Sequence, residues 1–521
     1  MKLYLAEKPS LGRAIASALP APHKKGDGCI YVSNGDVVTW CIGHVLEQAE
    51  PEAYDKNLKK WSLSPLPILP AKIGTGWKLV PKPKTRKQFS IIKKFIKQAD
   101  HIIHCGDPDR EGQLLVDEVI NHVGVSKNVL SKLQRCLIND LNQSAIKKSL
   151  ANLRPNNEFS ALSISALARS RADWMYGLNL TRACTLQAQK VGYKGVVSIG
   201  RVQTPILGLI VKRDHEIEQF KPVTYFEVLA HINIKESAAL IAKWKPSDAC
   251  APYLDPEGRV LNKALAENVL TRIQGQPAKV DTVENEQKKL SAPLPYSLSS
   301  LQIDAAKRHS LSAKKVLDAC QTLYEKHKLI TYPRSDNRYL PLEHHKQASN
   351  ILQAIQNNTQ LTSLCQGANI SLKSRAWNNA KISAHHAIIP TEKLANFSAL
   401  STSEKQVYTL ISKQYLCQFY PAWEYLDGKI VFRISGGEFI SKARTTTVSG
   451  WKDVLNPDTN VNENTNRLPA LTVGQIHQCE KAELVEKLSQ APKHFTDATL
   501  LAAITGIARY VSNLEIKKVL K

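Results

Sequence analysis

Three carboxylates stand close together in the stretch HCGDPDREGQ, residues 104–113. Asp107, Asp109 and Glu111 follow directly after an apolar run and precede a predicted helix. Carboxylates this close repel one another and retain protons unless a cation neutralises them, and an all-oxygen ligand set suits Mg²⁺. A solvated turn would explain the same residues, because Asp and Glu favour helix N-termini and Asp, Pro and Gly favour turns. The cluster therefore predicts either a magnesium site or an ordinary turn.

A fourth acid favours the metal interpretation. Glu7 ends the first apolar run, and Lys8, Pro9 and Ser10 open the next predicted helix, in the same order as at the acidic cluster. Ligands bind at the carboxyl ends of strands in open α/β sheets. If the two strands are neighbours, Glu7 joins the three acids and Lys8 offers a positive charge to a phosphate.

The elements that must position these residues alternate in type, which predicts an α/β domain over residues 1–150. The first apolar run, KLYLA, reads as a buried strand followed by a helix, and Asn34-Gly35 reads as the turn of a hairpin. Residues 88–98 and 113–122 have helical periodicity, and residues 102–105 are strand-like.

The rest of the chain is organised as an insertion. Residues 155–215 are predicted helical, and period-two alternation marks β segments near residues 225–234 and 429–443, the second turning at Gly436-Gly437. A helical segment at about 285–400 separates them, so two linkers form a natural hinge at its base. The Asn-rich stretch 456–469 predicts a mobile loop.

Composition points to nucleic acid. The chain has 521 residues, with 70 Lys and Arg against 46 Asp and Glu, and a formal net charge of +24. Such an excess attracts polyanions by releasing the counterions condensed on phosphates, although it would also serve solubility alone. Ten cysteines stand singly, without the C-x-x-C spacing of zinc sites, which indicates reduced thiols.

Membrane contact is not expected. The sequence has no run of 18 apolar residues and no secretory signal at MKLYLAEKPS, so we expect a cytoplasmic protein. The basic stretch KPKTRKQFSIIKKFIK, residues 82–97, predicts a helix with Phe89, Ile92 and Ile96 on one face. That face is more simply a core contact than a membrane anchor.

The motifs resemble a known family. AEKPSLGRAIASALP together with HCGDPDREGQLLVDEV is similar to the Toprim domain of type IA DNA topoisomerases, in which a lone Glu and a D-x-D-x-E motif surround Mg²⁺. LITYPRSDNRYLP, residues 329–341, resembles the active-site stretch of the family and implies Tyr332 as nucleophile and Arg334 as phosphate-binding partner. SAHHAIIPT matches the active-site histidine of the family at His385.

Further stretches extend the resemblance along nearly the whole chain. SALARSRADWMYGLNLTRA and SIGRVQTP resemble the helical DNA-binding segments of the family, although surface charge and core packing would explain their residues too. They imply DNA-binding roles for Arg169, Arg171, Ser198, Arg201 and Gln203. KKGDG, TWCIGHVLEQAEPEAYD and KHFTDATLLAAITGIARYV resemble the bacterial topoisomerase III subclass.

The resemblance implies a multidomain ring of α/β plus mixed α and β structure. The expected parts are a Toprim domain (1–152), a helical DNA-binding domain (153–217 and 486–521), a β arch (218–284 and 403–485) and a helical domain carrying Tyr332 (285–402). The two helical domains are expected to be related to winged-helix or CAP folds. The helical insertion would swing away on its two linkers to open a gate for a second strand.

The implied reaction needs no ATP, and the sequence has no G-x-x-x-x-G-K-[ST] phosphate loop. Tyr332 would attack a DNA phosphodiester, take the 5′ phosphate and leave a 3′ hydroxyl. Arg334, Lys8 and His385 would stabilise charge on the phosphate, and Glu7 would exchange a proton with the 3′ oxygen. The metal ligands would be Glu7, Asp107, Asp109 and Glu111, with Mg²⁺ positioning the hydroxyl for resealing.

The expected partners are single-stranded, negatively supercoiled or catenated DNA and a helicase, with the chain acting as a nucleoid-associated monomer. Two alternatives stay open: another Toprim phosphoryl-transfer enzyme such as a primase or nuclease, and a non-catalytic DNA-binding protein on the same scaffold. Family members continue beyond Lys521 into a G-x-G-T-type stretch, so we also expect a truncated form with exposed apolar surface, weak cleavage and poor relaxation.

Overall fold

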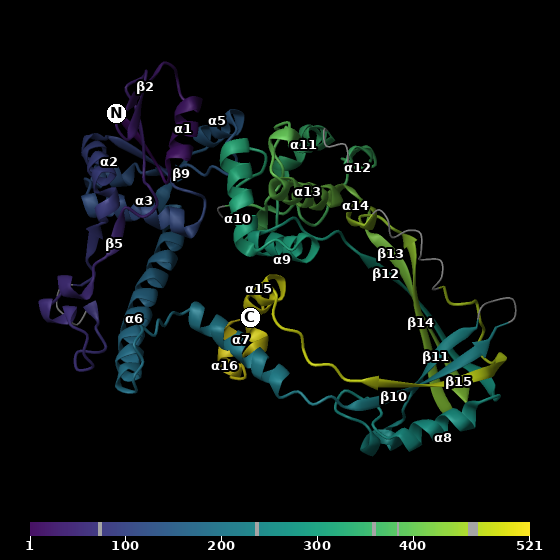
Figure 1. Ribbon diagram of the computed structural model, residues 1–521. Coiled ribbons are helices and arrows are strands. Elements are labelled where there is room, and N and C mark those ends of the chain that lie inside the picture. Colours follow the sequence, from purple (N-terminus) through teal and green to yellow (C-terminus); the bar gives the residue numbers. More distant parts are fainter. Residues whose placement is uncertain (71–75, 235–238, 357–360, 383–384, 457–466, 521) are drawn as a thin grey trace.

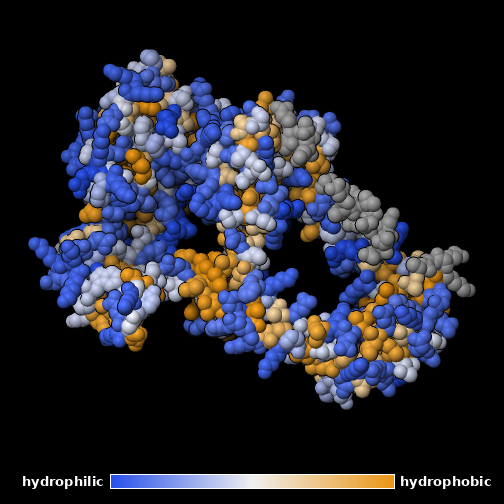
Figure 2. Space-filling view, viewed as in Figure 1, coloured by the Kyte–Doolittle hydropathy of each residue, from blue (hydrophilic) through white to orange (hydrophobic). Residues whose placement is uncertain are grey.

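The computed structural model describes the whole chain except residues 71–75, 235–238, 357–360, 383–384, 457–466 and 521. An α/β domain is followed by long helices and a β barrel, and a helical domain is inserted into that barrel (Figure 1). These parts surround an opening, which is visible between the helices and the barrel in Figure 2. The predicted ring architecture is confirmed.

A seven-stranded sheet forms the centre of the N-terminal domain, in the order β2-β3-β4-β1-β7-β8-β9. Strand β1 lies between β4 and β7 and runs parallel to both, so the carboxyl ends of β1 and β7 meet at one edge. The predicted turn at Asn34-Gly35 joins β3 to β4, and Gly35 has φ +83°, which glycine adopts at little cost. The strands are β1 (Lys2–Ala6), β2 (His23–Gly26), β3 (Cys29–Val32), β4 (Val37–Trp40), β7 (His101–Cys105), β8 (Gln134–Arg135) and β9 (Arg154–Pro155), with β5 (Leu46–Gln48) and β6 (Leu79–Pro81) paired separately.

Helices cover both faces of this sheet. Side chains of β1 alternate between two cores: Leu3 and Leu5 pack with α2 and α3, and Tyr4 and Ala6 pack with α1 and α5. The α1/α5 core continues into the inserted helical domain and includes Tyr332. The α2/α3 face therefore lies on the side of the sheet away from that domain. The helices are α1 (Pro9–Ala18), α2 (Arg86–Gln98), α3 (Arg110–Val123), α4 (Lys127–Ser131) and α5 (Gln143–Ala151).

Long helices connect the sheet to the barrel. Helix α6 (Ser160–Lys190) packs on α3, and α7 (Gln203–Glu218) leads towards the barrel. The predicted helical region 155–215 thus consists of two helices, separated by residues 191–202. Two C-terminal helices follow the barrel: α15 (Asp497–Thr505), which packs on α9 (Leu298–His309), and α16 (Leu514–Val519). Apolar side chains gather on the surface of this part (Figure 2).

The barrel is closed in the order β10-β11-β14-β13-β12-β15. Its second hairpin turns at Ser435 and Gly436, with φ of 48° and 82°, next to the predicted turn at Gly436-Gly437. The helical domain leaves after β12 and returns at β13, as the two β segments predicted. The elements are β10 (Thr224–Asn233), β11 (Leu240–Lys245), α8 (Lys263–Ile273), β12 (Pro277–Leu290), β13 (Trp423–Ile434), β14 (Gly437–Val448) and β15 (Ile476–Leu488).

The inserted domain consists of α9 (Leu298–His309), α10 (Ala313–Thr322), the π-helical turn η7 (Leu323–His327), α11 (Ala348–Gln356), α12 (Thr362–Gln366) and α13 (Thr402–Leu416), with α14 (Lys452–Leu455) packed on α13. Helix α13 packs on α9 and α10, because Val407, Tyr408 and Ile411 share their core. The sequence analysis placed residues from 403 onwards in the β arch. In the structure the arch resumes only at Trp423.

Two further expectations concern the surface. The predicted loop 456–469 lies largely outside the described residues, which omit 457–466. Among the helices that the structure describes, none is long and apolar enough to span a membrane.

Candidate active site

The strand ends bring Glu7 into contact with the acidic loop. Ala6 and Cys105 are register partners in the parallel pair β1/β7, so Glu7 and Gly106 leave the same edge of the sheet. The backbone N–H of Asp107 donates to Glu7 Oε2 at 3.0 Å. The condition set by the sequence, that the two strands be neighbours, is met.

Two glycines allow the acidic loop to fold tightly. A Cβ on Gly112 would lie 2.5 Å from Asp107 O and 2.5 Å from Glu7 Oε2, and a Cβ on Gly106 would lie 2.2 Å from Gly112 O. Real Cβ atoms do not approach other atoms so closely. A side chain at either position would therefore displace the acids.

Asp109 serves both interpretations of the cluster. Its Oδ1 accepts from the backbone N–H of Gly112 at 2.7 Å and so caps α3. Its Oδ2 accepts from the hydroxyl of Tyr332 at 2.6 Å. Asp109 therefore both caps helix α3 and contacts the predicted nucleophile.

Tyr332 reaches these acids from the inserted domain. Its side chain is 2% exposed, its backbone N–H donates to Asn139 O at 2.8 Å, and its ring meets Tyr324 edge-on at 5.9 Å. Burial, followed by the negative charges of Asp107 and Asp109, raises the pKa of the Tyr332 phenol. In this state the hydroxyl is a hydrogen-bond donor and not yet a phenolate.

Lys8 bridges the two domains. Its Nζ lies 2.9 Å from Asp107 Oδ2 and 3.0 Å from Glu325 Oε1, which belongs to the turn η7. Burial opposes the charge of Lys8, but the two carboxylates outweigh it and raise its pKa. The lysine therefore carries its positive charge at the centre of the site.

His385 makes a second bridge. Its Nδ1 lies 2.6 Å from the carbonyl oxygen of Pro108 and its Nε2 lies 2.7 Å from Asp336 Oδ1. Pro108 O and the Asp336 carboxylate are both acceptors, which favours the imidazolium, whereas the backbone N–H of Asp336, 3.3 Å from Nε2, favours the neutral ring. Burial disfavours the imidazolium charge, but the bonds to Asp336 and Pro108 outweigh it and raise the pKa of His385.

The acids themselves lack compensation. Burial and the charge of Asp107 raise the pKa of Glu7 to about 7, and burial raises the pKa of Asp107 even though Lys8 opposes the shift. Asp107 Oδ1 is buried and has no hydrogen-bond partner. A buried carboxylate oxygen in this situation is suited to a hard cation.

The acids nevertheless point to three different partners. Asp107 contacts Lys8, Asp109 contacts Tyr332, and Glu111 Oε1 lies 2.7 Å from Arg169 Nη2. Within the described ranges, no three acidic, histidine or cysteine side chains are grouped closely enough to hold an ion. The donor set fits Mg²⁺ in chemistry, but the side chains would have to regroup around it.

The predicted DNA-binding residues follow α6 and the start of α7. Arg169 touches the acidic loop, and Arg171 packs over the ring of Trp77 at 5.1 Å. Arg201 forms a two-point ion pair with Asp173, at 2.7 and 3.2 Å. The side chain of Gln203 donates to Ser198 Oγ at 2.8 Å.

Arg334 differs from its predicted neighbours because its side chain is exposed, although its charge acts on Asp107. The structure thus brings Glu7, Lys8, Tyr332, His385 and the three acids of the loop together. Arg334 stands at their edge, and the DNA-binding residues extend away from them along α6.

Three residues of the site escaped the sequence analysis. Glu325 and Asp336 each pair with a predicted catalytic cation, and Arg135, 1% exposed, donates to the carbonyls of Gly106 and Asp107 at 2.9 and 2.7 Å. Asp336 lies within the quoted active-site stretch and could have been found there. Arg135 and Glu325 stand outside every quoted motif, in segments that read as ordinary strand and helix.

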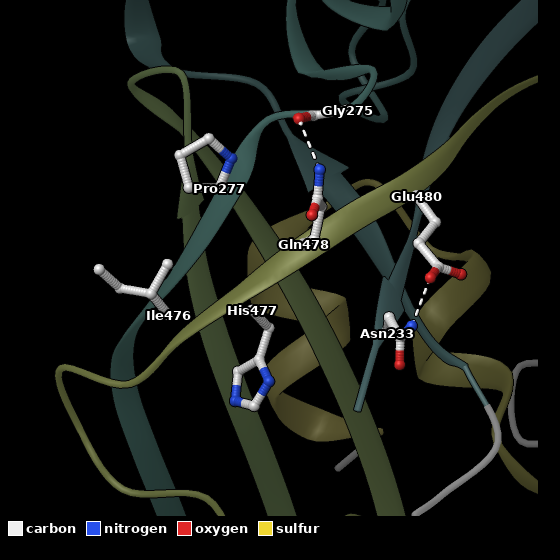
Figure 3. Close-up of a pocket in the computed structure, with 7 residues that line it drawn as sticks. All are labelled: Asn233, Gly275, Pro277, Ile476, His477, Gln478 and Glu480. Carbon is white, nitrogen blue, oxygen red and sulfur yellow. Dashed lines mark hydrogen bonds between the residues drawn. The ribbon is translucent and has the colours of Figure 1, made fainter. Parts of the chain in front are cut away.

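Two hollows lie outside this cluster. One of about 460 Å³ is at the end of the barrel, where Gln478 donates to Gly275 O at 3.2 Å and Asn233 contacts Glu480 (Figure 3). None of the residues that line it belongs to the predicted site. A second, of about 420 Å³, lies along α6 and is lined by Trp61 and Arg182 among others.

Comparisons with known proteins agree with this geometry. The chain matches the DNA topoisomerase family over residues 157–507 and the Toprim domain over residues 2–141. A protein named DNA topoisomerase 3 from Vibrio cholerae is 55% identical over 524 residues, covering all of this chain and 80% of that protein. Proteins of the same name from Haemophilus influenzae and Bacillus subtilis are 51% and 35% identical, covering 100% and 98% of this chain and 81% and 68% of theirs.

A solved structure supports the fold. Full-length topoisomerase I from Thermotoga maritima aligns with a TM-score of 0.66 at 20% identity, over 97% of this chain and 75% of that one. The family match alone spans more than half of the sequence. The chain therefore belongs to the type IA DNA topoisomerase family.

Proposed function

We propose that Tyr332 is the nucleophile of an ATP-independent type IA topoisomerase reaction that cuts, passes and reseals single DNA strands. The observation that carries this proposal is the bond between the Tyr332 hydroxyl and Asp109 Oδ2 at 2.6 Å, which joins the inserted domain to the acidic edge of the sheet. The two residues lie 223 positions apart in the sequence, so this bond is made only where the two domains meet.

The cleavage step can be assigned to side chains of this chain. Tyr332 Oη attacks the phosphorus, its proton passes to the carboxylate that accepts it in the structure, and the bond from phosphorus to the 3′ oxygen breaks. Glu7, whose pKa is raised to about 7, supplies a proton to that oxygen. The products are a 5′ phosphotyrosine and a 3′ hydroxyl, and resealing reverses each transfer.

Three cations surround the position of the phosphate. The partners of Lys8 and His385 raise the pKa of both side chains and so favour their charged forms, and Arg334 is exposed at the edge of the site. Positive groups placed before the reaction stabilise the charge that develops on phosphoryl oxygens in the transition state. Asp336 and Glu325 act by positioning His385 and Lys8.

Asp107, Asp109, Glu111 and Glu7 would hold Mg²⁺. When bound there, the ion would supply Lewis-acid stabilisation and alignment of the 3′ hydroxyl for resealing. This chain's own part is to provide the oxygen ligands, which requires Lys8, Tyr332 and Arg169 to release them.

Strand passage follows from how Tyr332 is attached. The inserted domain is joined to the barrel through β12 and β13 and packs on α15 through α9. Its contacts with the N-terminal domain are side-chain bonds, apolar packing and the backbone bond from Tyr332 N–H to Asn139 O. We infer that those contacts separate while DNA remains bound to both sides. Single-stranded, negatively supercoiled and catenated DNA are the proposed substrates. A helicase partner, a monomeric state and a location at the nucleoid stay predictions.

Covalent trapping tests the proposal. A single-stranded oligonucleotide labelled at its 3′ end should stay attached to the denatured protein, whereas the same oligonucleotide labelled at its 5′ end should not. Tyr332→Phe should abolish the adduct and retain DNA binding. Tyr408→Phe, at another buried tyrosine of the same domain, is the matched control. Cleavage without any adduct would instead indicate a Toprim nuclease.

A further inference from the structure

A strongly basic helix lies outside the site described so far. Residues 82–97 contain seven cations and no acid: Lys82, Lys84, Arg86, Lys87, Lys93, Lys94 and Lys97. Most of this stretch forms α2. Its apolar face is accounted for by the core, but its charged face is not.

The cations form one outward stripe along α2. Phe89, Ile92, Phe95 and Ile96 are buried against the sheet and α3, as the sequence analysis expected of the apolar face. The exposed positions follow the spacing i, i+1, i+7, i+8 and i+11, which places them on the opposite face. They are Arg86, Lys87, Lys93, Lys94 and Lys97.

This arrangement does not favour helix stability. The first turn of α2 holds Arg86 and Lys87 and no acid, although the helix dipole favours negative charge there. Lys93 and Lys97 stand four residues apart, where like charges repel. In the part of the chain that the structure describes, the stripe has one ion pair, between Lys87 and Asp27 at 2.8 Å, and both side chains are mostly exposed.

The stripe starts at the catalytic edge of the sheet. Gln88 Nε2, in the first turn of α2, donates to the carbonyl of Trp40, which ends β4. Strand β4 is parallel to β1, whose end precedes Glu7, so the N-terminus of α2 lies at the edge that carries the acids. From there α2 runs along the outside of the domain, away from the central opening (Figure 1).

An edge strand adds to the same face. Tyr31 on β3 contacts Phe95 with ring centroids 6.0 Å apart, and Lys24 on β2 is its register partner. Directly paired residues of antiparallel strands share a face of the sheet, so Lys24 lies on the α2 side. The positive surface therefore extends beyond the helix itself.

The chemistry of the stripe matches the backbone of duplex DNA. From Arg86 to Lys97 the stripe is about 16 Å long, which corresponds to about five phosphates of one strand measured along the duplex axis. Single-strand sites use exposed aromatic side chains to stack bases, and two of these, Tyr176 and Trp61, lie on or beside α6, whereas among the residues that the structure describes Tyr31 is the one beside α2.

We propose that α2 binds the sugar–phosphate backbone of the duplex that flanks the single-stranded segment at the active site. The choice of DNA as the ligand of this surface rests on the proposed function, whereas the basic surface itself is observed in the structure.

The test compares two adjacent lysine pairs on opposite faces of the same sheet. Lys93→Gln with Lys94→Gln removes part of the stripe, and Lys147→Gln with Lys148→Gln removes an equally exposed pair from α5. Both are made in a Tyr332→Phe background, so that binding is measured without cleavage. The probes are a 20-nucleotide single strand and the same strand joined to a hairpin duplex, titrated with salt.

The α2 variant should bind the hairpin probe about fivefold more weakly at physiological salt, with a log–log salt slope reduced by about 1.8, since each lost phosphate contact removes about 0.9. Its binding of the single strand, its melting temperature and both affinities of the α5 control should not change. Equal loss on both probes, equal loss in the control, or an unchanged hairpin slope would each overturn the proposal. Failure of the proposed function would appear separately, as absence of the covalent adduct in the unmodified chain.

Discussion

The inserted domain that carries Tyr332 is held in the ring by its connection to the barrel, by its contact with the N-terminal domain and by the packing of α15 on α9, where the backbone N–H of Ala313 donates to Asp497 Oδ2 at 3.3 Å. The first two of these differ in chemistry. Strands β12 and β13 join the domain to the barrel by a backbone ladder that runs from Ala278 and Ile434 to Leu290 and Trp423. The contact with the N-terminal domain has the backbone bond from Tyr332 to Asn139 but is made mostly by side chains, among them the bonds Tyr332–Asp109, Lys8–Glu325 and His385–Pro108. DNA phosphates and a metal can replace the partners of charged side chains, but they do not replace the many backbone bonds of the ladder. We therefore propose that the ring opens at the acidic edge and stays closed at the barrel.

The largest effect is expected when the contact between the inserted domain and the N-terminal domain is made covalent. Asn142 Nδ2 donates to the carbonyl of Lys328 at 3.2 Å across the contact. A disulfide between Asn142→Cys and Lys328→Cys should abolish plasmid relaxation under oxidising conditions, because no second strand can enter. Covalent cleavage of a short single strand should continue. Reduction should restore relaxation in the same sample, and relaxation by the oxidised, cross-linked protein would show that the gate lies elsewhere.

Removal of the metal ligands should have the next largest effect. Asp107→Asn with Glu111→Gln, which keeps Asp109 as the acceptor of the Tyr332 proton, should slow resealing about 100-fold while the covalent adduct still forms, because the proposed attack by Tyr332 does not use the ion. The measurement is the lifetime of the adduct after salt is added, with and without Mg²⁺. Chelation of Mg²⁺ from the unmodified protein should reproduce the variant. An equal loss of cleavage and resealing would contradict the division of roles.

A smaller change tests the bridge made by Lys8. Glu325→Gln removes one of the two carboxylates that hold Lys8 charged, and loss of one charge-assisted contact is worth about 1.4 kcal/mol, a factor of ten. We expect adduct formation in a single turnover to slow about tenfold with little change in DNA affinity. Glu343→Gln, at an exposed acid of the same domain, is the control. Matching rates in the two variants would remove Glu325 from the site.

The N-terminal domain could be predicted from the sequence because its signals are local. The run KLYLA, the Asn34-Gly35 turn and the periodicity of residues 88–98 each indicate one element, and strand β1 does lie beside β7. The proximity of Glu7 and Asp107 was predicted because ligands bind at the carboxyl ends of neighbouring parallel strands. The role of Tyr332 came only from the resemblance to a family, because nothing in the spacing of residues 107 and 332 indicates that they meet.

Other features could not be predicted because they depend on tertiary contacts. Helix α13 has its own helical pattern, but whether it belongs to the barrel or to the inserted domain is decided by its packing on α9 and α10. Arg135 looks like a surface residue until its carbonyl acceptors are seen. The pairing of each acid with a different partner likewise reflects how three domains meet.

The smallest predicted effect concerns two exposed ion pairs, of which only one is expected to lie on the path of the DNA. Arg201 pairs with Asp173 near the start of α7, and Arg433 pairs with Asp281 in the barrel at 3.3 Å. All four side chains are about half exposed, so neither pair contributes much to folding, and Arg201→Gln and Arg433→Gln should leave the melting temperature almost unchanged. On a single strand, however, Arg201 can exchange Asp173 for a phosphate. Arg201→Gln should therefore lower the salt slope of single-strand binding by about 0.7, the value for one phosphate contact, whereas Arg433→Gln should not. Equal slopes in the two variants would mean that the DNA path does not include Arg201.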